Sequence, residues 1–84
     1  MHWDVMTVKP VAPLALHVEF VDGTAGEVLF EASHLTGVFA ALKDPALFQQ
    51  AHVEGGAVTW PGDLDLAPDA MYQAIKAWGT WVLR

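Results

Sequence analysis

Residues 53–71 constrain the fold of this chain most, because two turns, a strand and a helix start follow one another there without a spacer. The adjacent glycines Gly55 and Gly56 accept the positive φ that a tight hairpin turn demands. The next four residues, ending at Trp60, alternate as a half-buried strand does, and a Pro-Gly pair then stops the strand. Pro68 fits the first position of a helix. We therefore expect a β-hairpin that leads directly into a helix.

Residues 14–21 form the clearest strand, because large apolar side chains recur at every second position. An Asp-Gly turn follows, and residues 27–31 can return antiparallel to it. Residues 3–9 alternate too, and we expect that first strand to end at Pro10, since proline cannot donate to a strand ladder. The expected core positions of the central strand are Leu14, Leu16, Val18 and Phe20.

The middle of the chain has helical rather than strand-like spacing. Apolar side chains recur every three or four positions in residues 33–44, but Gly37 lies among them. We therefore expect a broken helix, or a helical turn on each side of this glycine. Asp44 can cap a short helix over residues 46–50, and Pro45 presets the backbone for its first position.

The C-terminal part of the chain is predicted to be a helix that covers one face of the sheet. From Pro68 onward, apolar residues recur at helical spacing, although Gly79 interrupts the helix at a cost of about 1 kcal/mol relative to alanine. Residues 80–84 are expected as a helical end, an extended segment or a frayed tail. Trp78 and Trp81 either pack against the sheet or form a surface for self-association or for a partner. The predicted apolar stripe consists of Met71, Ile75, Trp78 and Val82.

Together these elements predict a single compact α+β domain over residues 1–84, with an antiparallel sheet of about five strands in two hairpins, a short central helical segment and a C-terminal helix. Hydrophobic residues make up 54% of the chain, which is typical of a globular protein. The absence of cysteine excludes disulfides and thiolate metal sites and fits a reducing cytoplasm. We find no secretory signal and no apolar run of about 18 residues, so we expect a soluble cytoplasmic protein without membrane contact.

The chain is acidic, with ten carboxylates against four Lys and Arg and a formal net charge of -6. Proteins that bind nucleic acid directly usually neutralise its phosphates with clustered Lys and Arg, and the four cations here are too scattered for that. The acidity either keeps a small hydrophobic domain soluble or attracts a basic protein partner.

The acidic run after Trp60 is the strongest candidate for a ligand or metal site. Asp63 and Asp65 lie two positions apart and can both face a hard cation, and Trp60 can form an aromatic wall for a cationic ligand. Turn formation explains the same residues, because the run lacks the glycine and terminal glutamate of a calcium loop. The four histidines have no metal-binding spacing, and Ser33 beside His34 has no evident third group for a nucleophilic site. We expect no catalytic residue, no metal and no cofactor.

Three blocks of the sequence have the order and spacing of a small bacterial family: the turn at Asp22, residues 37–48 and residues 58–69. On these blocks the chain resembles domain of unknown function 2442, from about residue 3 to about residue 75. The resemblance implies a compact α+β domain with an antiparallel sheet, and no established activity or catalytic residues. Members are also found fused to a helix-turn-helix module, or encoded beside a second small protein in the manner of a toxin and antitoxin pair. We expect no DNA-binding module here, and residues 78–84 lie beyond the resemblance.

Two functions from different classes are expected. The first is a non-enzymatic interaction module, the antitoxin-like or regulatory half of a two-protein pair, whose partner is a small basic protein; self-association is a further expectation. The alternative is a small ligand- or metal-binding protein or an enzyme that uses the loop from Trp60 to Asp65. The candidate interaction residues are Trp60, Asp63, Asp65, Trp78 and Trp81.

Overall fold

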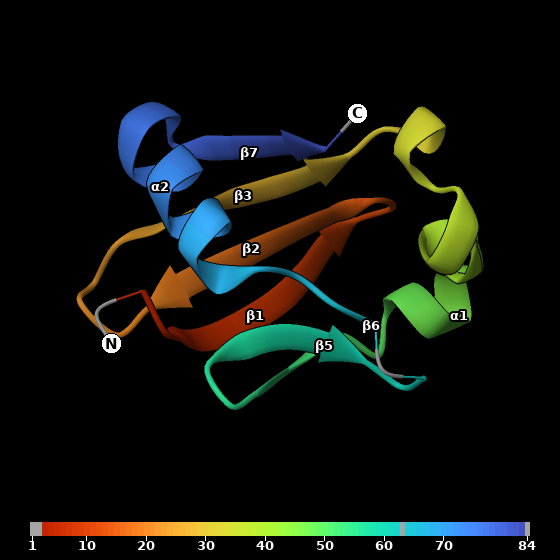
Figure 1. The fold of residues 1–84 in the computed structure, drawn as a ribbon, viewed down its shortest axis with the longest axis horizontal. Coiled ribbons are helices and arrows are strands. Elements are labelled where there is room, and N and C mark those ends of the chain that lie inside the picture. The colour runs from red at the N-terminus through yellow and green to blue at the C-terminus, as the bar shows by residue number, and fades with distance from the viewer. Residues whose placement is uncertain (1–2, 63, 84) are drawn as a thin grey trace.

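The computed structural model describes residues 3–62 and 64–83, with the backbone alone described at His34 and Val38. Four strands form one sheet, in the spatial order β1-β2-β3-β7 (Figure 1). The first three strands are antiparallel, as predicted, whereas β7 pairs parallel with β3 and is the extended C-terminal segment. The strands are β1 (Val5–Ala12), β2 (Ala15–Phe20), β3 (Ala25–Phe30) and β7 (Thr80–Leu83).

β1 continues through Pro10, so the expectation that proline ends this strand is wrong. β1 is an outer strand of its sheet, and proline is tolerated on such a strand where its missing N–H faces no ladder partner. A register irregularity between Val5 and Thr7 also changes the alternation of side chains. Val5 is buried, and Val8 rather than Thr7 packs against the core.

β2 confirms the strand predicted over residues 14–21, but it is one residue shorter at each end. Leu14 lies in the two-residue turn between β1 and β2 rather than in the strand, and its φ of 63° is positive. Its side chain is half-buried and packs against the core. The buried inner side chains of β2 and β3 are Leu16, Val18, Phe20, Val28 and Phe30.

Three further strands form a separate small sheet, so the described residues make two sheets where one was expected. The predicted hairpin about Gly55 and Gly56 is confirmed, with φ angles of 61° and 79° at the two glycines. The hairpin lies beside β1, and the N–H of Val5 donates a 2.8 Å hydrogen bond to the carbonyl of Gly56 (Figure 1). The strands are β4 (His52–Glu54), β5 (Ala57–Trp60) and β6 (Leu64–Asp65).

The segment between β3 and β4 is helical in short pieces, which confirms the break expected at Gly37. This glycine begins the second piece with a φ of 59°. The carboxylate of Asp44 accepts a 3.0 Å hydrogen bond from the N–H of Ala46, as expected for the cap of a helix that starts at Pro45. The pieces are the 3-10 helices η1 (Ala32–His34) and η2 (Gly37–Lys43) and the helix α1 (Pro45–Phe48).

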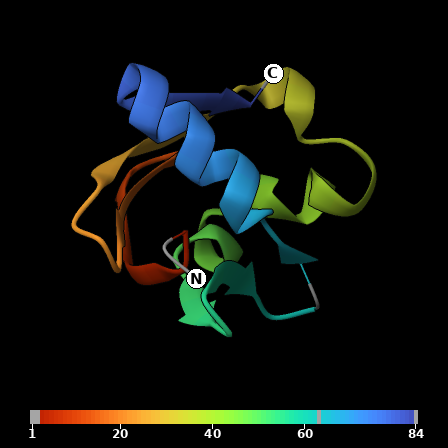
Figure 2. The same cartoon turned by 60° about the vertical axis from the view of Figure 1, so that its left-hand side comes forward.

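α2 (Pro68–Trp78) covers one face of the four-stranded sheet (Figures 1 and 2). It begins at Pro68, as predicted, and its side chains Met71 and Ile75 are buried in the core. No helix among residues 3–62 and 64–83 is long and apolar enough to cross a membrane.

The core joins both sheets to η2, α1 and α2. An aromatic cluster lies in it: the rings of Phe30 and Phe48 meet edge to face at 5.5 Å, and each lies 6.1 Å from Trp60. Edge-to-face pairs of this kind add stability beyond the area that they bury. The α+β fold with a C-terminal helix is therefore confirmed.

Candidate functional site

Trp78 is the most exposed of the large hydrophobic side chains in the described part of the chain, with 80% of its surface accessible. It is the last residue of α2, because Gly79 takes the left-handed conformation and donates a 2.8 Å hydrogen bond to the carbonyl of Ile75. The helix therefore ends before Val82 can join the predicted apolar stripe. The expectation that Trp78 packs against the sheet is wrong, because at the end of the helix its side chain faces solvent.

Trp81 lies on β7, directly after this helix end, and has the opposite environment. It pairs with Val28 of β3 and shares the inner face of the sheet with it. Trp81 and Leu83 are half-buried and pack against the core, whereas Thr80 and Val82 lie on the outer face. Of the two alternatives predicted for the tryptophans, packing against the sheet is therefore what the structure shows for Trp81.

β7 has an open edge. It is the last strand in the sheet order, and no described backbone group pairs with its outer side. The N–H of Glu31 donates a 2.8 Å hydrogen bond to the carbonyl of Leu83. Because alternate residues of a parallel strand bond to the same neighbour, Thr80 and Val82 direct their backbone groups away from β3. These unpaired groups can accept a further strand.

Trp60 is a core residue rather than a surface residue. It is 1% exposed, and its indole N–H donates a 3.1 Å hydrogen bond to the carbonyl of Phe48, which joins β5 to α1. Its ring therefore has no free face for a cationic ligand. Asp65 is exposed on β6, where it pairs with Thr59 of β5. Asp63 lies outside the described residues, so the predicted pair of carboxylates cannot be placed.

The histidines on the strands have local carboxylate neighbours. His17 Nδ1 lies 2.5 Å from Glu27 Oε2 on the outer face of the four-stranded sheet, and both side chains are about half exposed. His52 Nε2 lies 3.5 Å from Glu54 Oε2. Within residues 3–62 and 64–83, no three His, Asp or Glu side chains are close enough together to hold a metal ion.

The model of the family described as "Protein of unknown function (DUF2442)" matches residues 5–77. The chain belongs to this family. The match runs from the start of β1 almost to the end of α2, which confirms the resemblance seen in the three sequence blocks. Trp78 and β7 lie beyond the matched residues. No curated protein and no solved structure matches the chain.

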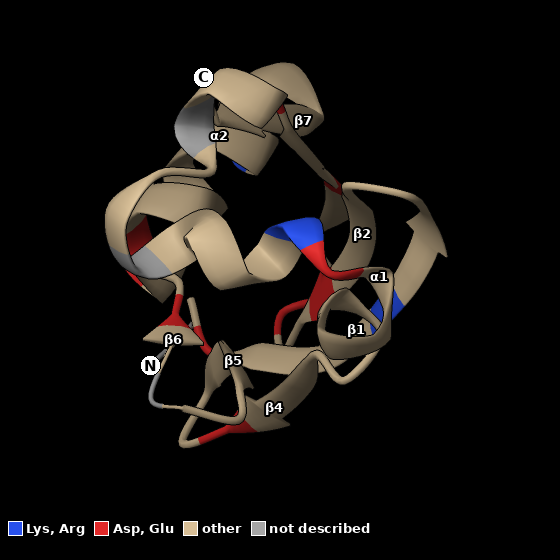
Figure 3. Cartoon of the chain, turned by 90° about the vertical axis from the view of Figure 1, so that its right-hand side faces the viewer, with Lys and Arg blue, Asp and Glu red and all other residues tan. Residues whose placement is uncertain are grey.

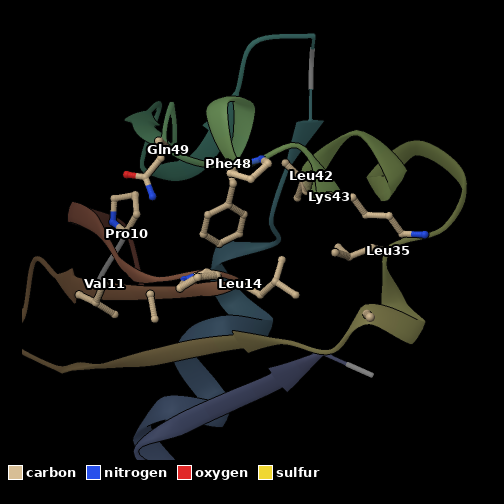
Figure 4. A pocket seen from close by; sticks show the side chains of 12 residues that line it. Pro10, Val11, Leu14, Leu35, Leu42, Lys43, Phe48 and Gln49 are labelled. Carbon is tan, nitrogen blue, oxygen red and sulfur yellow. The ribbon is translucent and has the colours of Figure 1, made fainter.

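This member of DUF2442 also has an apolar pocket, of about 520 Å³, that no sequence pattern indicated (Figure 4). It lies between the β1–β2 turn and the segment from η2 to α1. Buried Leu35, Leu42 and Phe48 form its floor, Leu14 forms a wall, and Lys43 lies at one end. These residues come from parts of the sequence that no periodicity links, so the pocket appears only when the chain is folded. The feature of the sequence that lies nearest to the pocket is Leu14, an apolar residue in the two-residue turn between β1 and β2.

Proposed function

We propose that this protein is a non-enzymatic interaction module, which binds a small basic protein by pairing a strand of the partner with the open edge of β7. The observation that carries the proposal is an unpaired strand edge directly after Trp78, a tryptophan that is 80% exposed. Addition of a strand gives affinity through backbone hydrogen bonds, and side-chain pockets beside it give specificity. Tryptophan is among the residues that most often dominate binding energy at interfaces.

The geometry at the end of α2 supports the same surface. Gly79 ends α2 and turns the chain into β7. Trp78 therefore lies beside Thr80, at the end of the strand edge where β7 begins. A strand docked on β7 would reach the end of α2, where the exposed indole of Trp78 is available as an apolar anchor. The outward groups of Thr80 and Val82 supply the backbone contacts.

The charge of the chain supports a basic partner. The formal net charge is -6, and acidic residues lie on many elements with few basic residues among them (Figure 3). Glu27 lies on β3 and Glu31 directly follows this strand, and both are backbone neighbours of β7. Complementary charge mainly raises the association rate and selects among partners. We therefore propose that the two proteins form a regulatory pair in the cytoplasm, with this chain as the antitoxin-like half.

The alternative, a ligand or metal site on the loop from Trp60 to Asp65, has less support. Trp60 lies in the core, and Asp65 is the one carboxylate of the predicted pair that the structure describes. No contact of the described loop residues favours a ligand, so we retain the interaction module as the proposed function.

Co-expression with the product of the adjacent gene tests the proposal. The complex would be measured by size-exclusion chromatography with light scattering and by calorimetry. Val82→Pro removes an outward N–H without removing a hydrogen bond to β3, and Trp78→Ala removes the anchor. We expect each variant to bind at least about tenfold more weakly, which corresponds to about 1.4 kcal/mol.

Met6→Ala is the matched control, because Met6 is also an exposed apolar residue, 51% accessible, but lies on β1 at the other side of the sheet. It should bind as the unmodified protein does. Absence of a complex, or a complex that neither Val82→Pro nor Trp78→Ala weakens, would overturn the proposal. If the protein instead forms a homodimer that the same two variants dissociate, the partner at this edge is a second copy of the chain.

A further inference from the structure

The pocket at the end of the β1–β2 hairpin has the properties of a small-molecule site. Its volume of about 520 Å³ lies within the usual range for ligand pockets, and its lining is mostly apolar, with Lys43 and Gln49 as its polar side chains. In Figure 4 the ring of Phe48 points from α1 toward the hairpin turn, and Leu42 and Leu35 continue the apolar surface to one side. The pocket thus offers an elongated apolar surface rather than a compact hole.

Leu14, in the wall of this pocket, has a backbone conformation that leucine rarely adopts. It is the one non-glycine residue in the described part of the chain with a positive φ, at 63°. Pro13 before it suits the first central position of a type II turn, whose second central position favours glycine. A glycine would relieve the strain but would remove the side chain from the pocket wall. Strained residues of this kind persist where the surrounding structure holds them in place, and they cluster at active and ligand sites.

Lys43 gives the pocket a charge at one end. It is the charged member of the described lining residues, and its side chain extends beyond Leu42 at the end where Leu35 lies (Figure 4). The carboxylate of the next residue, Asp44, bonds to the backbone of α1, and no described carboxylate forms an ion pair with Lys43. The flexible lysine stem lets the ammonium group reach a negative group placed over Leu35.

We propose that this pocket binds a small amphipathic carboxylate, with its aliphatic chain over Phe48 and Leu14 and its carboxylate at Lys43. The apolar surface would contribute most of the binding free energy, and Lys43 would select a negative head group over a neutral one. The proposal is independent of the interaction module, because none of the residues that line the pocket belongs to β7 or is Trp78.

Titration with octanoate and with octanol tests the proposal, because the two compounds share an aliphatic chain and differ in charge. Binding would be followed by backbone amide shifts in the full chain. We expect the largest shifts at Leu14, Leu35 and Phe48, and tighter binding of octanoate. Lys43→Met should weaken octanoate about two- to fivefold, as expected for an exposed charge pair, and leave octanol unchanged. Lys43→Arg should retain the preference, and Lys76→Met, at an exposed lysine on α2, is the control.

Leu14→Gly tests the wall of the pocket separately from the charge. We expect weaker binding of both octanoate and octanol, with an unfolding temperature close to that of the unmodified protein because relief of the strain at φ 63° offsets the lost packing of a half-buried side chain. Thermal unfolding of each variant establishes that it is folded. Shifts located outside the pocket, equal binding of the two compounds before and after Lys43→Met, or unchanged binding in folded Leu14→Gly would each overturn the proposal.

Discussion

The hydroxyl of Tyr72 on α2 donates a 2.6 Å hydrogen bond to Oδ2 of Asp22, in the turn between β2 and β3. The ring of Tyr72 also meets Phe20 edge to face at 5.2 Å, so one side chain joins the helix to the sheet and to its turn. The bond from Tyr72, followed by a bond from the backbone of Thr24, lowers the pKa of Asp22 from 3.8 to about 2. Both bonds favour the charged carboxylate, which is why the pKa falls.

This lowered pKa predicts a dependence of stability on pH. Because the pKa of Asp22 is lower in the folded than in the unfolded protein, its stabilising contribution is fully present above the unfolded value of 3.8 and is lost as the pH falls toward about 2. We expect Tyr72→Phe to raise the pKa of Asp22 toward 3.8 and to reduce this dependence. Carbon NMR of the side-chain carboxyl gives the pKa, and urea unfolding at several pH values gives the stability. An unchanged titration of Asp22 in Tyr72→Phe would contradict the assignment.

Replacement of Trp60 tests its role as the link between β5 and α1. We expect Trp60→Ala to lower the free energy of unfolding by about 3 to 5 kcal/mol, because it empties a buried aromatic position. Trp60→Phe should cost less, about 1 to 3 kcal/mol, because it shortens the buried ring and removes one hydrogen bond to the carbonyl of Phe48, which keeps its bond from the N–H of Ala51. Asp65→Ala and Asp63→Ala, in the acidic run, should each cost under about 0.5 kcal/mol. Denaturant unfolding compares the four variants, and equally small effects would show that Trp60 does not stabilise the contact between β5 and α1.

Gly26 is predicted to tolerate no side chain. A Cβ built there would lie 2.4 Å from the carbonyl oxygen of Gly79 and 2.7 Å from Cγ2 of Ile75. Gly26→Ala should therefore destabilise the fold by about 1 to 3 kcal/mol, as overpacking of a core does, because β3 must move away from the end of α2. Ala25→Ser, at the neighbouring exposed position, should stay within about 0.5 kcal/mol. Thermal and denaturant unfolding distinguish them; a neutral Gly26→Ala would mean that α2 is free to shift.

The cap of α1 gives a fourth prediction. Asp44→Ala removes the carboxylate that bonds to the N–H of Ala46 and should cost about 0.5 to 2 kcal/mol. Asp44→Asn keeps an acceptor at the same place and should cost little. Hydrogen exchange of the Ala46 amide, together with unfolding in urea, would show the difference. Equal effects of the two substitutions would rule out the cap as the source of stability.

Local chemistry made several elements predictable from the sequence. The glycine pair at Gly55 dictated a hairpin, and Asp44 with Pro45 dictated a capped helix, because each depends on two or three neighbouring residues. Pro10 was misread because its tolerance depends on its place at the outside of the sheet, which neighbouring residues do not reveal. Val82 was wrongly placed on the apolar stripe of the helix because helical spacing was extended past Gly79, whose left-handed conformation ends the helix.

The candidate surface and the pocket were less accessible to sequence reasoning. β7 has four residues, too few for a clear alternation, and its parallel pairing with β3 depends on where α2 delivers the chain. The pocket depends on a turn residue, Leu14, meeting residues of η2 and α1 that have no sequence relation to it. Both features arise from packing between distant segments, whereas alternation and capping describe single segments.

The parallel pairing of β7 with β3 also determines the order in which a newly synthesised chain can complete its fold. Glu27 emerges from the ribosome more than fifty residues before its neighbour Thr80. Until then, one side of β3 has unsatisfied backbone groups, and contacts between such distant residues form slowly. For most of its synthesis, a nascent chain can therefore pair the free edge of β3 with strands of other chains. A chain that stops before β7 would keep this edge unpaired and would be prone to aggregation.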